Sequence, residues 1–125
     1  MFDWSDYLHL SGRLLESDPD DEACQRSAIG RSYYAMFNTA KALLINERVA
    51  IPPTGAAHEI AWQAMQQAPR GVRRRIAQAG FRVRRRRDLA DQEADYPTVA
   101  ADAVRCVEWS RRTVDDIRGE RDAAS

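Results

Sequence analysis

The sequence predicts an all-α protein, folded as an antiparallel bundle of four or five helices. Its 125 residues are the length of one ordinary domain and are enough to bury a core. Residues that favour helices are common, and β-branched residues rarely alternate with polar ones. Most of the prolines and glycines lie between stretches in which apolar residues recur at helical spacing.

An acidic segment separates the first two expected helices. The first helix is predicted at about 4–16, where apolar residues mark one side: Trp4, Tyr7, Leu8, Leu14 and Leu15. Segment 17–21 contains a proline and three aspartates. It therefore ends the first helix and supplies acidic caps for the second.

The second helix, at about 21–48, is expected at the centre of the bundle. Apolar residues on one side step by four and three positions: Ile29, Tyr33, Met36, Ala40 and Leu43. The other side consists mainly of small residues, with Arg31 and Asn38 as polar insertions. A helix that is apolar on two sides is normally packed from both. Arg31 and Asn38 would then either satisfy each other or line a pocket.

Prolines divide the rest of the chain into three further helices. Pro52 and Pro53 stand in a loop before a helix at about 56–67, and Pro69 ends that helix. The next helix, at about 72–94, has a predicted core side of Val72, Ile76, Ala79 or Gly80, Val83, Ala90 and Ala94.

The break at Tyr96-Pro97 precedes the last helix, which is predicted at about 98–118. Its apolar side contains Val104, Val107, Val114 and Ile117, with Trp109 near the edge. The sequence thus predicts a single domain at 1–118 and a frayed tail at 119–125.

The charge is distributed unevenly although its sum is zero. Residues 70–87 contain nine arginines and no acid, and residues 88–102 contain five acids and no base. The triplet at 73–75 recurs eleven residues later at 84–86, so both triplets share one face of a helix. The resulting stripe, on the order of 25 Å long, could follow the phosphates of RNA or DNA. The candidate contacts are Arg73, Arg74, Arg84, Arg85 and Arg86. The alternative is a solvated face paired with acids such as Glu47.

Arg87 differs from the other arginines, because its spacing from Val83 and Ala90 places it close to the core side of its helix. A buried guanidinium group needs a partner. Either Arg87 forms an internal salt bridge, for example with Asp91 four residues later, or it is held in a cleft to meet a phosphate.

Several classes of site find no support in the sequence. The two cysteines and the two histidines are far apart, and no Gly-rich phosphate loop or metal-binding motif is present. No metal or cofactor is therefore expected, and His58 is expected to be a packing or capping residue. The chain has no apolar run of membrane length and no recognisable leader, which predicts a cytoplasmic protein without a membrane partner.

Segment 28–44, with its Arg31 and its Tyr33-Tyr34-Ala35, resembles the second-helix signature of small HEPN-domain proteins. His58 and Ala94-Asp95-Tyr96 match further features of that family. The resemblance implies a HEPN-like bundle that forms a homodimer, and a partner protein of the nucleotidyltransferase type. It also implies a place in a toxin–antitoxin or defence system, in which many HEPN proteins are metal-independent ribonucleases.

The ribonuclease motif of that family is an arginine followed by a histidine after four to six positions. Arg87-Asp88 fits its beginning, but positions 92–94 are Gln, Glu and Ala. The resemblance makes Arg87 and Tyr96 the catalytic candidates, and Asp91 stands where a related subgroup has its arginine. Two functions therefore remain open. One is an RNA-associated protein with weak or degenerate ribonuclease activity, and the other is a non-catalytic dimerisation module that binds a nucleotidyltransferase.

Overall fold

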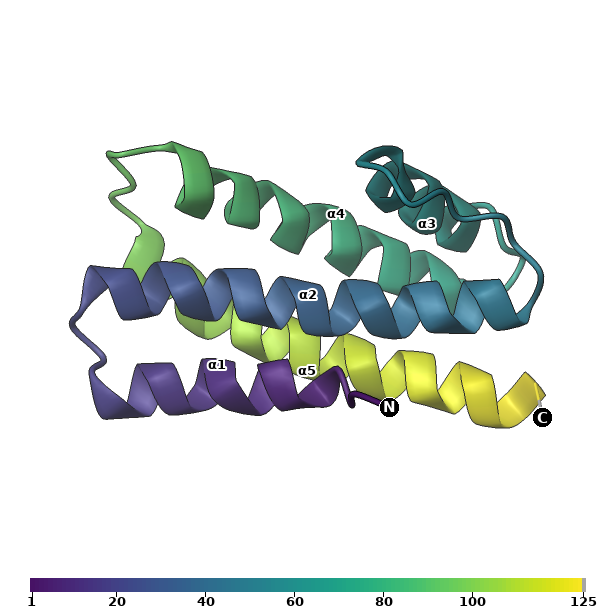
Figure 1. The fold of residues 1–125 in the computed structure, drawn as a ribbon, viewed down its shortest axis with the longest axis horizontal. Coiled ribbons are helices and arrows are strands. Elements are labelled where there is room, and N and C mark those ends of the chain that lie inside the picture. The colour runs from purple at the N-terminus through teal and green to yellow at the C-terminus, as the bar shows by residue number, and fades with distance from the viewer. Residues whose placement is uncertain (125) are drawn as a thin grey trace.

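The computed structural model describes residues 1–124 and contains five helices in this range, without a strand. These are α1 (Ser5–Ser17), α2 (Glu22–Asn46), α3 (Ala56–Gln66), α4 (Gly71–Gln92) and α5 (Val99–Ala124). The four long helices lie lengthwise, with successive ones running in opposite directions, and the short α3 covers one end (Figure 1). The predicted all-α bundle is confirmed. Within residues 1–124, no helix combines the length and apolar character needed to cross a membrane.

Helix α2 is the centre of the bundle, because it packs against all four other helices. Ile29, Tyr33 and Met36 on its apolar seam are completely buried. The opposite side is only half covered, since α1 has 13 residues and α2 has 25. On that side Ala35 is buried, whereas Ile45 near the end of the helix is 50% exposed.

The last helix differs from its prediction in two respects. Val104, expected in the core, is 63% exposed. The buried face of α5 instead follows Ala103, Cys106, Val107, Ser110, Val114 and Ile117, and Val104 points roughly 120° away from the middle of that face.

The predicted frayed tail is also replaced by helix, because α5 continues to Ala124. Glu120 is buried and accepts a hydrogen bond from Arg73 (2.9 Å), and it also pairs with Arg70 (3.0 Å). These contacts hold the end of α5 against the start of α4. The last residue of the predicted tail, 125, lies outside the described residues.

Helix α4 ends at Gln92, two residues before the predicted end. The guanidinium group of Arg26 donates hydrogen bonds to the carbonyl oxygens of Ala90, Glu93 and Ala94, at 2.6 to 3.0 Å. Terminal carbonyl groups of a helix have no partner within the helix itself. Arg26 supplies that partner and so fixes the end of α4 against α2.

Candidate functional site

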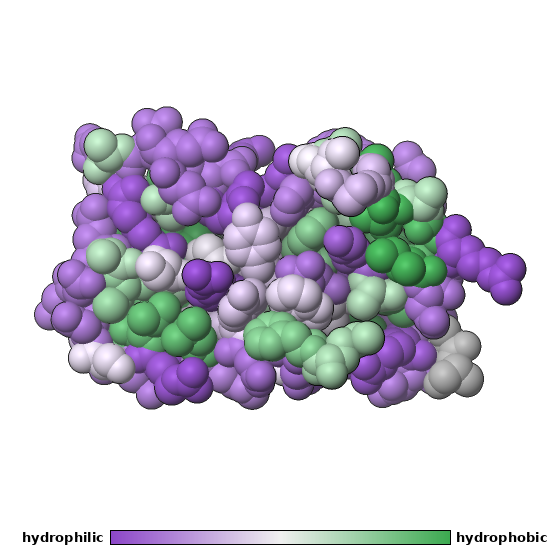
Figure 2. Space-filling model, in the orientation of Figure 1, coloured by the Kyte–Doolittle hydropathy of each residue, from purple (hydrophilic) through white to green (hydrophobic). Residues whose placement is uncertain are grey.

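The arginines of α4 form two groups with different surroundings. Arg73, Arg84, Arg86 and Arg87 are partly buried against other helices, and Arg74, Arg75, Arg82 and Arg85 are exposed. Helix α4 is continuous over this whole segment, as the predicted stripe required. In the view of Figure 2, hydrophilic residues dominate the region over α4, and apolar residues reach the surface in separate patches elsewhere.

Arg73 belongs to an internal ion network and not to the predicted phosphate-binding surface. Its side chain is 13% exposed. Both terminal nitrogens donate to the carboxylate of Glu47 (2.6 and 2.7 Å), and Nε donates to Glu120 (2.9 Å). Hydrogen bonding by Arg73 lowers the pKa of Glu47. The pairing with Glu47, which the sequence suggested as the alternative, is thus present for this arginine.

Arg84 and Arg86 also have acidic partners on neighbouring helices. Arg84 lies 3.3 Å from Glu59 of α3, and Arg86 lies 3.7 Å from Asp102 of α5. About a quarter of each arginine side chain remains exposed (27% and 26%). Of the five predicted contacts, only Arg74 and Arg85 are therefore exposed, and Arg75 and Arg82 join them on the outer face.

Arg87 is held at the junction of α2 and α4. Its side chain is 16% exposed, Nη1 donates to the Tyr34 hydroxyl (2.6 Å), and Nη2 donates to Asp88 (2.8 Å). The guanidinium carbon also lies 5.3 Å from the ring centre of Tyr33. Among residues 1–124, Arg87 forms its ion pair with Asp88 and not with Asp91, the partner that the sequence suggested. Arg87 is thus oriented by contacts on several sides.

His58 joins this cluster from α3, which the sequence spacing alone did not indicate. Its Nδ1 atom lies 2.7 Å from the Tyr33 hydroxyl, and its ring stacks on Phe37 with 4.1 Å between centres. Burial, together with the nearby Arg84 and Arg87, lowers the pKa of His58. This lowered pKa favours the neutral form of the imidazole. His58 thus packs against Phe37, as expected, and its ring nitrogen also contacts Tyr33.

Tyr96, which the resemblance made a catalytic candidate, lies in the core and not at the surface. It is 5% exposed, and its hydroxyl donates to the carboxylate of Asp102 (2.7 Å). Burial and this hydrogen bond raise the pKa of Tyr96. Since Asp102 also accepts from Thr98, the hydroxyl of Tyr96 helps to anchor the start of α5.

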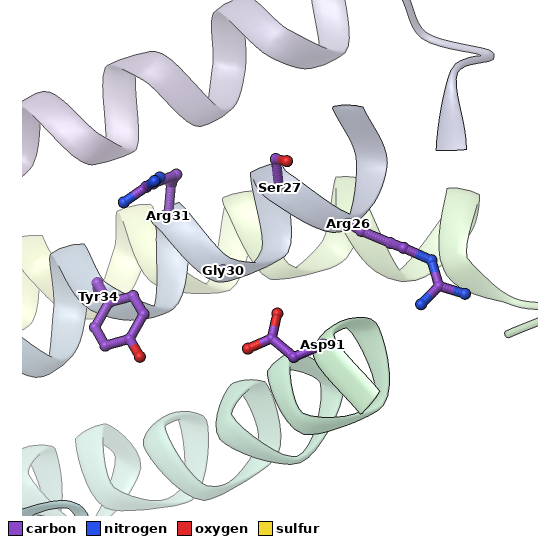
Figure 3. A pocket seen from close by; sticks show the side chains of 6 residues that line it. All are labelled: Arg26, Ser27, Gly30, Arg31, Tyr34 and Asp91. Atoms are coloured by element: carbon purple, nitrogen blue, oxygen red, sulfur yellow. The ribbon is translucent and has the colours of Figure 1, made fainter. Parts of the chain in front are cut away.

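A small polar pocket of about 240 Å³ lies between α2 and the end of α4. Figure 3 shows its lining: Arg26, Ser27, Gly30, Arg31, Tyr34 and Asp91. Arg31 is among the lining residues, which is one of the two alternatives that the sequence left open for it. Its guanidinium carbon lies 5.0 Å from the ring centre of Tyr7. Asn38 is not in the lining, because its amide donates to the backbone oxygen of Tyr34 (2.9 Å). Arg31 and Asn38 therefore do not satisfy each other.

Asp91 changes what this pocket can bind. Its carboxylate faces the space between the two helices (Figure 3), and Arg26 is occupied by backbone carbonyls and Glu22. Arg31 points away from Asp91, toward the ring of Tyr7 on α1 (Figure 3). The carboxylate of Asp91 therefore disfavours a phosphate in this pocket. Within residues 1–124, no group of three or more His, Cys, Asp or Glu side chains has an arrangement suited to a metal ion.

Comparison of the chain with protein-family models, curated proteins and solved structures finds no match.

Proposed function

We propose that the protein is a HEPN-type, RNA-associated module of a toxin–antitoxin or defence-like two-component system, and that it holds RNA through the outer face of α4. One observation carries the proposal. Arg74, Arg75, Arg82 and Arg85 are exposed on a single helix that has no acidic residue before position 88. From Arg74 to Arg85 this face extends about 16 Å, which allows contacts with several phosphates.

Pairing within the protein does not account for these four arginines. Among residues 1–124, no carboxylate lies within ion-pair distance of these four side chains. The other arginines of α4 all have such partners: Arg73, Arg84, Arg86 and Arg87. The outer arginines thus keep their charge available. Guanidinium groups bind phosphates well, because their donors match the geometry of two oxygens.

The salt dependence of RNA binding tests this proposal. Each lost phosphate contact with a single strand should flatten the slope of log K against log salt by about 0.7. The variant Arg75→Ala/Arg85→Ala should therefore lower the slope by about 1.4 and weaken binding at low salt. The matched control is Arg13→Ala/Arg121→Ala, which removes two exposed arginines from α1 and α5. Equal slopes for the two double variants would contradict RNA binding by α4.

RNA cleavage is a second candidate function, and the cluster around Arg87 favours it. The family motif lacks its histidine in the sequence, but His58 reaches the same cluster through the Tyr33 hydroxyl. A neutral imidazole can accept a proton, and an arginine can stabilise the charge on a phosphate.

Incubation of structured and unstructured RNA with the purified protein in chelator tests this second function. Either Arg87→Lys or His58→Ala should reduce cleavage about a hundredfold or more, with circular dichroism confirming the fold. If the wild-type protein cleaves none of the RNAs, the chain is a binding module only.

Homodimer formation, which the RNA-associated protein and the non-catalytic module for a nucleotidyltransferase partner would share, has its own supporting observation. A groove of about 440 Å³ lies between the N-terminal segment, α2 and α5. Phe2 (49% exposed) and Ile45 (50% exposed) add apolar surface at this end of the molecule. We expect a second copy of the chain to cover it. Light scattering should give a dimer mass for the wild type and a monomer mass for Ala42→Glu, which places a charge in the groove.

A further inference from the structure

Trp109 of α5 is surrounded by arginines from two helices. Its indole ring is half-buried, and the guanidinium carbons of Arg82 and Arg86 lie 4.8 and 5.1 Å from the ring centre. Arg105 and Arg112 stand four residues before and three residues after Trp109, so they share its side of α5. An aromatic ring thus lies among four arginines on the seam between α4 and α5, and of these five side chains only Arg82 belongs to the proposed α4 contacts.

Acidic residues balance only part of this charge. Asp102 pairs with Arg86 (3.7 Å), and Glu108 pairs with Arg112 (3.0 Å). Within the described chain, neither Arg82 nor Arg105 has an ion pair. The next carboxylate on this side, Asp116, is two turns from Trp109, about 10 Å along the helix. The cluster therefore keeps a surplus of positive charge directly beside the indole.

Packing between helices explains the position of Arg86 but not that of Arg82. Arg86 is anchored on both sides, by Asp102 and by its contact with Trp109. Arg82 is exposed, and its contact with Trp109 is the one interaction of its guanidinium group among residues 1–124. A cation–π contact at an exposed site is weaker than the stacking of a nucleobase on an aromatic ring. A base can consequently replace Arg82 on the indole with a net gain.

We propose that the seam between α4 and α5 binds a single-stranded polynucleotide, with one nucleobase stacked on Trp109. Arg82 then leaves the ring and contacts a flanking phosphate, and Arg105 contacts the phosphate on the other side. Bases in a duplex are stacked on each other and do not present a face to the indole, so the site selects single strands. The inference rests on the proposed RNA-binding function. It adds that the RNA is single-stranded and that one of its bases stacks on Trp109.

Three oligonucleotides of one sequence test the inference: single-stranded RNA, single-stranded DNA and a fully paired RNA duplex. Fluorescence anisotropy should show tighter binding of the single strands. Trp109→Leu should weaken single-strand binding by roughly tenfold or more, since base stacking on an aromatic ring has that magnitude. The slope of log K against log salt should stay unchanged, because no phosphate contact is removed. The RNA and DNA arms distinguish the two sources of the strand.

Tryptophan fluorescence supplies a second readout that does not depend on the stability of the leucine variant. Single-stranded RNA should quench the wild type and Trp4→Phe, whose ring lies on the α1 side, but not Trp109→Phe. Trp62 is completely buried and does not respond. Trp109→Phe keeps an aromatic face, so its affinity should stay close to that of the wild type.

The outcomes separate this inference from the proposed function. Quenching that persists in Trp109→Phe, or binding by Trp109→Leu within twofold of the wild type, overturns the stacking site. If Arg75→Ala/Arg85→Ala still flattens the salt dependence in that case, RNA binding by α4 stands without it. Trp109-dependent binding of DNA alone would keep the stacking site and overturn the assignment to RNA. Failure to bind any of the three oligonucleotides at low salt overturns both proposals.

Discussion

Arg87 lies close to the buried side of α4, where it donates a hydrogen bond to the Tyr34 hydroxyl and its charge is compensated by Asp88. Hydrogen bonds to a charged group contribute about 1.5–3 kcal/mol each. Tyr34 thus fixes one half of the guanidinium group. This role depends on a contact between α2 and α4, in which the two residues are 53 positions apart in the sequence.

We predict that Tyr34→Phe and Arg87→Lys each lower the free energy of unfolding by about 1.5–3 kcal/mol. The first change removes the acceptor, and the second removes the planar fork that reaches both partners. Since both remove the same hydrogen bond, the double variant should lose at least 0.5 kcal/mol less than the sum of the two, which is about the limit for independent sites. Urea unfolding followed by circular dichroism measures all three. Strict additivity would show that the Tyr34–Arg87 bond contributes nothing.

Glu47 predicts a dependence of stability on pH. Its pKa in the folded protein is lowered from the ordinary value of 4.5, mainly because Arg73 donates hydrogen bonds to it. A carboxylate with a lowered folded-state pKa stabilises the protein above its unfolded-state pKa, and this stabilisation disappears as the pH falls through the folded-state pKa. Glu47→Gln should therefore cost about 1–2 kcal/mol at neutral pH.

The difference between Glu47→Gln and the wild type should shrink as the pH is lowered below the ordinary pKa of Glu47. Urea midpoints measured from neutral to acidic pH test this. Glu59→Gln is the control, because Glu59 is 55% exposed and its ion pair with Arg84 contributes less than a more buried pair. A constant difference between wild type and Glu47→Gln across the pH range would contradict the predicted role of the Arg73 pair.

At the scale of elements, the contact between α3 and α4 depends on a missing side chain. Gly80 is buried in the middle of α4, and a methyl group there would overlap the ring of Trp62. The sequence left Ala79 and Gly80 as alternatives for the core side, and the structure buries Gly80 and leaves Ala79 half-buried. Glycine permits the two helices to approach closely at this point.

Gly80→Ala should destabilise the protein, although alanine is the better helix former. Overpacking lowers the free energy of unfolding by about 1–3 kcal/mol. The higher helix propensity of alanine raises it by only about 0.5–1 kcal/mol. Gly30→Ala is the matched change in α2, where an added methyl group meets no atom within 4 Å. It should raise stability by up to about 1 kcal/mol. Thermal unfolding of both variants checks this opposite pair, and a stabilised Gly80→Ala would show that α3 shifts without cost.

For the molecule as a whole, α2 is the helix on which all the others pack. Met36 lies in its middle and is completely buried, whereas Ile45 near its end is 50% exposed. Met36→Ala should lower the free energy of unfolding by about 2–5 kcal/mol, as other large-to-small changes in cores do. Ile45→Ala should change it by about 0.5 kcal/mol or less. Chemical denaturation compares them, and similar losses for both would contradict the central position of α2.

The sequence by itself determined the class of fold and the approximate position of every helix. Apolar spacing in α2 and the prolines at 52, 53, 69 and 97 report on local geometry, which neighbouring residues largely decide. The same spacing indicated the central place of α2 and the burial of Tyr33 and Met36, because a side that is apolar at helical period must be covered.

Only the tertiary structure decided what each charged side chain of α4 does. Helical period tells which arginines share a face, but the acids that engage Arg73, Arg84 and Arg86 come from the residue after α2 and from α3 and α5. For the same reason Tyr96 is buried against Asp102, His58 contacts the hydroxyl of Tyr33, and Trp109 contacts arginines that are distant in the sequence. A partner on another helix depends on how the helices are rotated and shifted against each other. That arrangement arises from packing over the whole bundle and leaves no local pattern in the chain.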